Sequence, residues 1–218
     1  FLLPTACTQE ELLDTIRLIN EDDTIHGCLM FRPLSNKDDE TAACALLAPE
    51  KDVDCMTSGS LASVFTGKGA GYPPCTAQAC LELLDYYGIP LRGKRVTVIG
   101  RSLVIGKPVS MMLQSRDATV TMCHTKTVDM PAICRSADII ISAAGKAGVV
   151  DERFAFPGQI ILDVGINVDE NGKLCGDVKF DKVEPIVEAI TPVPAGVGAV
   201  TTAVLAKHVI EAAEKKMK

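Results

Sequence analysis

Short apolar segments alternate with amphipathic ones through the second half of this chain. The apolar segments are residues 95–99, 118–123, 138–143 and 159–164. They are rich in β-branched residues, as strands covered on both faces of a sheet require. Helical stretches separate them, for example residues 109–116. Because parallel strands need crossover helices, this rhythm predicts an α/β fold with a parallel sheet, helices on both faces and right-handed crossovers.

Helical periodicity dominates the two ends of the chain. Thr8 and Glu11 form a capping box ahead of Leu12, and the apolar residues from there to Ile19 share one helical face. The last segment, residues 198–218, is rich in helix formers. The other predicted elements are a strand at residues 24–31, helices at 38–47 and 76–87, and a turn at Asn171 and Gly172.

The glycine turn after the first apolar strand is the most informative junction. Gly100 ends the strand, Gly106 follows, and Pro108 suits the first turn of a helix because its missing N–H has no partner there. Such a turn directs free N–H groups and the positive end of a helix dipole at an anion. An ordinary strand-to-helix connection is the alternative, since the spacing is not G-x-G-x-x-G. Arg101 and Ser102 favour a phosphate site, because a guanidinium and a hydroxyl both bond phosphate oxygens.

The end of the next strand bears on which cofactor this turn would hold. In a dinucleotide site that strand ends beside the adenosine ribose, where an acid bonds the 2′-hydroxyl and repels a 2′-phosphate. Here the strand is followed by residues 124–127, HTKT, which include no acid. The hydroxyls and the basic side chain, together with Arg101, favour NADP over NAD. The alternative is a solvated loop without a ligand.

Composition narrows the classes of partner. The net charge of -6 argues against nucleic acid, because phosphate backbones require clustered Lys and Arg. No apolar run approaches the roughly 18 residues that span a bilayer, and residues 1–7 lack the basic flank of a signal peptide. The 9 cysteines include no C-x-x-C pair. This pattern favours reduced thiols in a cytoplasmic enzyme over disulfides or a metal site.

Several long motifs occur in the order found in one enzyme family. They are LAPEKDVD, PPCTAQA, GRSLVIGKP, ATVTMCHTKT, ADIIISAAGKAG, DVGIN, CGDV and ITPVPAGVGAVTT. From about Thr8 to its end, the chain resembles the bifunctional methylenetetrahydrofolate dehydrogenase/cyclohydrolase family. The resemblance implies oxidation of 5,10-methylenetetrahydrofolate to the methenyl form with NADP, and hydrolysis of that product to 10-formyltetrahydrofolate.

The same resemblance implies two domains and a homodimer. The first is a Rossmann-like, parallel-sheet NADP domain at residues 90–195. The second is an α/β catalytic domain built from both termini, residues 1–89 with residues 196–218. The expected partners are therefore tetrahydrofolate derivatives and a second copy of the chain, without nucleic acid or membrane.

Site residues also follow from the resemblance. Gly100, Arg101 and Ser102 would bind the cofactor phosphates, with Arg101 and Thr125 near the 2′-phosphate. Asp54 would anchor the pterin in the catalytic site, since a carboxylate can accept two N–H bonds from an aminopyrimidine edge. Taken alone, Asp54 suits a turn or a helix cap. The remaining expected contacts are Ile166 and Thr201 for the cofactor, and Met30, Phe31, Arg32, Pro194, Ala195, Gly196, Val197 and Gly198 for the folate.

The chain departs from the family pattern at several positions. Phe31 stands where the family has a glutamine that helps hold the folate and the catalytic lysine, and Phe31 cannot hydrogen-bond. Ala195 and Ala199 replace the usual glycine and proline of the loop that closes over folate and nicotinamide, so we expect a slightly altered loop. Thr125 keeps the hydroxyl of the usual serine.

The family's catalytic tyrosine and lysine have no counterpart in this sequence, and by resemblance they belong to a segment that would precede Phe1. We therefore expect the chain to keep NADP binding better than cyclohydrolase activity. A lysine beside a cationic substrate would be readily deprotonated. Lys51 is a conceivable substitute, although a loop lysine next to two aspartates more often forms a surface ion pair.

Two other functions stay open from the sequence. One is another two-domain NAD(P) dehydrogenase, acting on shikimate or an amino acid, and the ordered folate motifs disfavour it. The other is a nucleotide-sensing or scaffold protein that has lost its chemistry. The missing lysine favours this second function, whereas Asp54 and the TPVPAGVG loop oppose it.

Overall fold

The computed structural model describes residues 1–216, which form two compact units. Unit 1 consists of Phe1–Cys75 and Leu205–Lys218, and unit 2 of Thr76–Val204. Unit 2 extends beyond both ends of the cofactor domain predicted at residues 90–195. The reason is packing, because side chains of residues 83, 84 and 199 line the same cavity as Ile161 of the sheet.

Unit 2 is built on a five-stranded, fully parallel sheet. Its strands are β1 (Arg95–Ile99), β2 (Thr119–Cys123), β3 (Ile139–Ser142), β4 (Ile160–Asp163) and β7 (Ala189–Ile190). Their order in the sheet is β2-β1-β3-β4-β7. In this register Val98 pairs with Met122 on β2 and with Ile141 on β3. The predicted α/β fold and four of these strands are thus confirmed, and β7 is an additional short strand.

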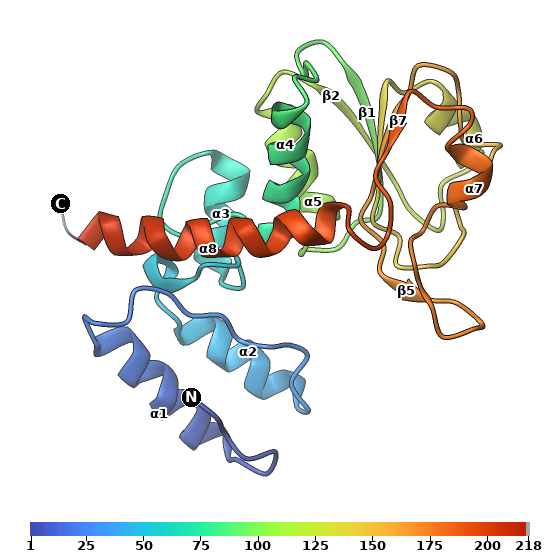
Figure 1. Ribbon diagram of the computed structural model, residues 1–218. Helices are drawn as coiled ribbons and strands as arrows, with labels where there is room; N and C mark the ends of the chain where they lie inside the picture. Colours follow the sequence, from blue (N-terminus) through green and yellow to red (C-terminus); the bar gives the residue numbers. More distant parts are fainter. Residues whose placement is uncertain (217–218) are drawn as a thin grey trace. The chain divides into compact units, whose positions relative to one another are not determined.

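Helices cover both faces of this sheet, with α4 and α5 on one side and α6 and α7 on the other (Figure 1). These helices are α4 (Cys75–Tyr86), α5 (Gly106–Gln114), α6 (Met130–Arg135) and α7 (Phe180–Val183), while α8 (Val197–Lys216) begins in unit 2 and continues into unit 1. Alternation along the strands explains the layers, since successive side chains point to opposite faces. Ile140 and Ile161 pack in one buried cluster with Cys134 of α6 and Val183 of α7.

A two-stranded hairpin extends from the sheet, formed by β5 (Asn167–Val168) and β6 (Leu174–Cys175). The predicted turn joins them, and Gly172 has a φ of +77°. Within residues 1–216 we find no helix with the length and apolar content needed to cross a bilayer.

Unit 1 contains the helices α1 (Gln9–Glu21), α2 (Lys37–Leu46) and α3 (Ser58–Thr66) and a short 3-10 helix, η1 (Pro49–Lys51). The predicted capping box is present, because the Thr8 hydroxyl accepts from the Glu11 N–H at 3.3 Å and the Glu11 carboxylate accepts from the Thr8 N–H at 2.7 Å. The apolar face of α1 is buried against α2, where Ile16 and Ala43 belong to one core cluster.

The strand predicted at residues 24–31 is wrong. Within the described chain, this segment pairs only through an isolated parallel bridge between Cys28 and Asp52. The Cys28 N–H donates to the Lys51 carbonyl at 2.6 Å. Apolar residues favour extended backbone, but a strand also needs a neighbour along its length, and local sequence does not specify one.

Candidate cofactor and substrate sites

The glycine turn after β1 lies at a topological switch point of the sheet. Strand β1 stands between β2 and β3, so a crevice is expected at the carboxyl ends of these strands. Gly100 has a φ of +130°, and a Cβ there would lie 2.3 Å from the Ala143 carbonyl oxygen. A Cβ on Gly106 would lie 2.3 Å from the Gly100 carbonyl oxygen. Glycine at both positions lets α5 begin directly against the end of β1.

Ser102 is used partly by the turn itself. Its hydroxyl oxygen accepts from the N–H groups of Ile105 at 3.1 Å and Gly106 at 3.5 Å. The expectation that these helix N-terminal groups are free is therefore wrong, because a side chain occupies two of them. The hydroxyl proton of Ser102 can still donate to a phosphate oxygen. Arg101, which precedes it, is exposed.

The loop after β2 is an ordered turn that presents polar side chains. The His124 N–H donates to the Thr127 hydroxyl at 2.8 Å, and the Lys126 N–H donates to His124 Nδ1 at 3.1 Å. The side chains of Thr125 and Lys126 are exposed. Because β1 and β2 end as paired neighbours, Arg101 and Thr125 follow adjacent strand ends. A 2′-phosphate at the ribose position would meet a guanidinium and a hydroxyl there.

A cavity of about 350 Å³ lies at the carboxyl end of β4. One wall is the loop after β4, and the other is the loop that leads into α8. The predicted site residues Ile166, Pro194, Ala195, Gly196, Val197 and Gly198 all line it. Ile166 is 69% exposed, so its side chain is available to a ligand. Thr201 is not among the lining residues, and its hydroxyl donates to the Val197 carbonyl at 3.2 Å.

Two buried carboxylates, which we call the acid pair, were missed by the sequence reasoning. They are Asp163 at the end of β4, 3% exposed, and Asp177 after β6, fully buried. Both lie in motifs already recognised, DVGIN and CGDV, to which no role was given. The available signal was an aspartate that directly ends an apolar strand, since a buried charge needs dedicated partners.

The ionisation of Asp163 gives a testable pH dependence. Burial raises the pKa of Asp163 to about 6, although three main-chain N–H bonds lower it. The unfolded value is about 4, so the folded protein takes up this proton first. Asp163 therefore adds stability as the pH falls from about 6 to about 4, and this contribution is lost as the pH rises through about 6. NMR titration of the Asp163 carboxyl carbon should give a midpoint near pH 6, and a midpoint below about 4 contradicts this.

Ala195 adopts the left-handed conformation that suits the family's usual glycine, with a φ of +71°. That conformation costs an alanine roughly 1–2 kcal/mol. We expect Ala195→Gly to raise the free energy of unfolding by about 0.5–1 kcal/mol, because the greater freedom of glycine in the unfolded chain offsets part of the gain. Ala199→Gly, inside α8, should instead lower the free energy of unfolding, because glycine is a poorer helix former than alanine. Urea unfolding measures the free energy of unfolding of both variants. Equal losses of stability in the two would show that Ala195 is unstrained.

In unit 1, the two aspartates of the DVD motif differ in their surroundings. Asp52 is fully buried and accepts from the N–H groups of Met56 at 2.9 Å and Thr57 at 2.8 Å. Asp54 is only partly buried, and its Oδ1 accepts from the Cys75 N–H at 2.9 Å. Asp54 therefore caps the start of α4 through one oxygen while staying accessible, which makes it the better ligand of the two.

The backbone next to Asp54 is held from helix α8. The carbonyl oxygen of Val53 lies 2.9 Å from His208 Nδ1 and accepts from the Cys75 thiol at 3.3 Å. The ring of Tyr72 lies against His208, with centroids 4.9 Å apart. These contacts fix the direction in which the Asp54 side chain leaves the main chain.

The predicted contacts at residues 30–32 lie in the segment that is bridged to Asp52 through Cys28. Met30 packs on the core cluster of unit 1, so the structure gives it a packing role. Phe31 is 86% exposed, and the Arg32 Nη1 atom lies 4.0 Å from Oε1 of Glu40.

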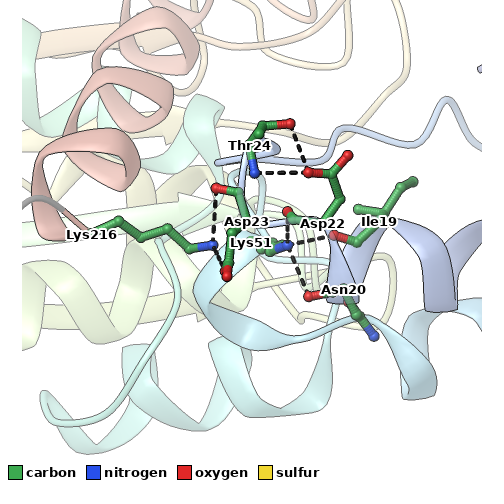
Figure 2. A network of polar contacts seen from close by, with 7 residues as sticks. All are labelled: Ile19, Asn20, Asp22, Asp23, Thr24, Lys51 and Lys216. Atoms are coloured by element: carbon green, nitrogen blue, oxygen red, sulfur yellow. Dashed lines mark hydrogen bonds and ion pairs between the residues drawn. The ribbon is translucent and has the colours of Figure 1, made fainter.

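Lys51 is neither a free base nor part of a surface ion pair (Figure 2). It is 4% exposed, and its ammonium donates to the carbonyl oxygens of Ile19 at 2.5 Å, Asn20 at 2.9 Å and Asp22 at 2.7 Å. An ammonium has three N–H donors, and all three are used by the carbonyls at the end of α1. Lys51 is thus a buried cap of α1, and both expectations for it are corrected.

Among residues 1–216 there is no group of three or more His, Cys, Asp or Glu side chains placed to hold a metal ion. Unit 2 offers a glycine turn with an exposed guanidinium and a small cavity along one sheet edge. Unit 1 offers an accessible, oriented carboxylate.

Two family descriptions match two separate parts of the chain. Residues 74–217 match the tetrahydrofolate dehydrogenase/cyclohydrolase NAD(P)-binding domain, and residues 1–54 match the catalytic domain of the same name. The bifunctional protein FolD of Clostridioides difficile is 51% identical over 205 residues, which is 94% of this chain and 71% of that protein. FolD of Carboxydothermus hydrogenoformans is 51% identical over 216 residues, which is 98% of this chain and 75% of that protein.

Solved structures agree with these matches. The bifunctional FolD enzyme of Campylobacter jejuni has a TM-score of 0.94 at 38% identity and is covered over 76% of its length by 98% of this chain. The FolD enzyme of Trypanosoma brucei, complexed with NADP cofactor and an inhibitor, has a TM-score of 0.91 at 36% identity, with coverage of 99% of this chain and 76% of that one.

Proposed function

Because this chain belongs to the tetrahydrofolate dehydrogenase/cyclohydrolase family, we propose that it oxidises 5,10-methylenetetrahydrofolate with NADP and hydrolyses the methenyl product to 10-formyltetrahydrofolate, in one-carbon metabolism. The observation that carries the proposal is the sheet edge of unit 2. It combines a glycine turn at the switch point, an acid-free loop after β2 and a cavity beyond β4. We accordingly assign the cofactor to unit 2 and the pterin to unit 1.

The cofactor assignment uses groups along that edge, of which Arg101, Ser102 and Thr125 are exposed. Gly100 and Ser102 meet the pyrophosphate, while Arg101 and Thr125 meet the 2′-phosphate. Ile166, which lines the cavity beyond β4, would hold the nicotinamide end. NADP, when bound, supplies the acceptor for a hydride. The contribution of the chain itself is to orient the reactants, because hydride transfer requires that the methylene carbon be held against the acceptor with water excluded.

The pterin assignment uses Asp54. A carboxylate accepts two N–H bonds from the aminopyrimidine edge of a pterin, and the contact from Cys75 already orients this one. In the second reaction, water adds to the methenyl carbon and a proton is released. Lys51 does not move this proton, because its donors cap α1. We therefore expect the hydrolysis step to depend on a group other than Lys51.

We also propose that the protein works in the cytoplasm as a homodimer. Family resemblance supports the dimer. The cysteines, all free in the structure, support a reducing compartment. Light scattering at several protein concentrations tests the dimer, and a mass of one chain throughout would exclude it.

The test of the function is an NADPH-formation assay with 5,10-methylenetetrahydrofolate and NADP. We expect NADPH only when both are present, and Asp54→Asn should raise the KM for folate without changing the Kd for NADP. A protein that binds NADP but forms no NADPH and ignores added folate would be a sensor and would overturn the proposal. Hydrolysis of 5,10-methenyltetrahydrofolate is followed separately, and a rate that matches the oxidation would show that the family's catalytic lysine is dispensable.

A further inference from the structure

The side chain of Asp177 is the most heavily bonded carboxylate of unit 2, and no step proposed above uses it. It is fully buried on a loop between β6 and α7. Five donors surround it, whereas a buried carboxylate needs only enough partners to offset the loss of water. The donors come from two separate segments, one that follows β3 closely and one that follows β4.

The first of these loops follows β3. The Asp177 carboxylate accepts from the N–H groups of Ala144 at 2.7 Å, Gly145 at 3.3 Å and Lys146 at 2.9 Å. It also accepts from the Ser142 hydroxyl at 3.1 Å. Three successive N–H groups are therefore turned toward one side chain, which fixes the path of the chain where it leaves β3.

The second loop follows β4 and forms one wall of the 350 Å³ cavity. Asp177 accepts from Asn167 Nδ2 at 3.0 Å, and Asp163 accepts from the Gly165 N–H at 3.0 Å. Ile166, which faces the cavity, is thus held from both sides. The Asp163 N–H in turn donates to the Thr191 hydroxyl at 2.8 Å, which ties the opposite wall to β4.

The two acids are packed without spare room. A Cβ on Gly165 would lie 2.2 Å from Asp177 Oδ1, and a Cβ on Gly176 would lie 1.9 Å from Asp163 Oδ2. The Asp177 N–H donates to Asp163 at 3.0 Å, which joins the pair directly. The glycines of DVGIN and CGDV therefore leave the space that the two carboxylates occupy, and the two motifs pack as a single structural element.

We propose that Asp177, supported by Asp163, is the positioning residue for the nicotinamide half of the cofactor site. This inference depends on the proposed function. In a doubly wound sheet the adenosine half lies at β1 and β2, and the second half of the dinucleotide lies across the switch point. The five donors to Asp177 come from the end of β3 and the loop after it, and from Asn167, which begins β5 beyond β4, so all of them lie on that second side. Asp177 thus fixes the surface on which the reacting ring lies without touching the reacting atoms.

The chemistry of the side chain supports a carboxylate at this position. Both oxygens of Asp177 accept hydrogen bonds, Oδ1 from Lys146 and Asn167 and Oδ2 from Ser142 and Ala144. An asparagine would present an NH2 group to one of these sets of donors. At least two donors would lose their acceptor, and the loops would separate to find water.

The test compares Asp177→Asn with Asp181→Asn, an exposed aspartate that loses the same charge. Three binding and kinetic readouts are measured on the full chain: the Kd for NADP, the Kd for 2′,5′-ADP, which carries only the adenosine half, and kcat for hydride transfer. Asp177→Asn should weaken NADP binding by about 10- to 100-fold and lower kcat, while the Kd for 2′,5′-ADP changes less than about twofold. Asp181→Asn should leave all three unchanged.

A milder pair of variants covers the case in which Asp177→Asn does not fold. Asn167→Ala removes one donor, and Asn171→Ala changes an exposed turn residue of the hairpin. We expect Asn167→Ala to weaken NADP binding by about five- to tenfold with 2′,5′-ADP unaffected, and Asn171→Ala to have no effect. Equal losses for NADP and 2′,5′-ADP, or no loss for either, would overturn the role of Asp177. A wild-type chain that binds both ligands but forms no NADPH would instead overturn the proposed function.

Discussion

Arg101→Ala should weaken NADP binding by about 100-fold and leave NAD binding almost unchanged. Hydrogen bonds between a charged donor and a charged acceptor contribute about 1.5–3 kcal/mol each. A guanidinium can make two such bonds to one phosphate, so the loss of about 3 kcal/mol corresponds to this factor. Fluorescence titration of NADPH and NADH measures both affinities.

The control for Arg101 is Arg92→Ala, which removes the same charge from an exposed residue that precedes β1. Thr125 gives a second and independent test of the 2′-phosphate position. Thr125→Asp should reverse the preference toward NAD, because a carboxylate bonds the ribose 2′-hydroxyl and repels a 2′-phosphate. Equal losses for the two cofactors in Arg101→Ala would place the guanidinium on the pyrophosphate instead.

Lys51→Met should lower the free energy of unfolding by about 3 kcal/mol. The substitution keeps a long apolar side chain but leaves the carbonyls of Ile19, Asn20 and Asp22 without their buried donor. Each buried acceptor that loses its partner costs about 1–3 kcal/mol, and water that enters the site recovers part of the sum. Urea unfolding followed by circular dichroism measures the change.

Lys68→Met is the matched control, because Lys68 is exposed and the same charge is lost. We expect it to change the free energy of unfolding by less than about 0.5 kcal/mol. If Lys51→Met kept the stability of the wild type and abolished hydrolysis of the methenyl substrate, Lys51 would have a chemical role and the capping assignment would be wrong.

The sheet of unit 2 was predictable because its signal is local. Runs such as Val96–Ile99 and Ile139–Ser142 are short, β-branched and apolar, and helical stretches separate them. The glycine turn was predictable for the same reason, since Gly100 and Arg101 directly follow a strand. Which N–H groups stay free was not predictable, because it depends on where the Ser102 side chain turns.

Three features could not be derived from the sequence, and each depends on contacts between distant segments. The strand predicted at residues 24–31 fails because its pairing partner is a single bridge to Asp52. Lys51 becomes a cap because the end of α1 lies beside it. The role of Asp177 depends on two loops that meet only after the sheet has formed. In each case the sequence shows the residue type, and the packing decides its partner.

We expect one edge of unit 2 to hold the whole cofactor, with its phosphates at the turn after β1 and its redox ring beyond β4. A crystal structure of the NADP complex tests this most directly. We predict the 2′-phosphate within hydrogen-bond distance of Arg101 and Thr125, and the nicotinamide against Ile166 in the cavity that Ala195 lines. NADP bound elsewhere, or bound with its nicotinamide outside that cavity, would show that this edge is not the cofactor site.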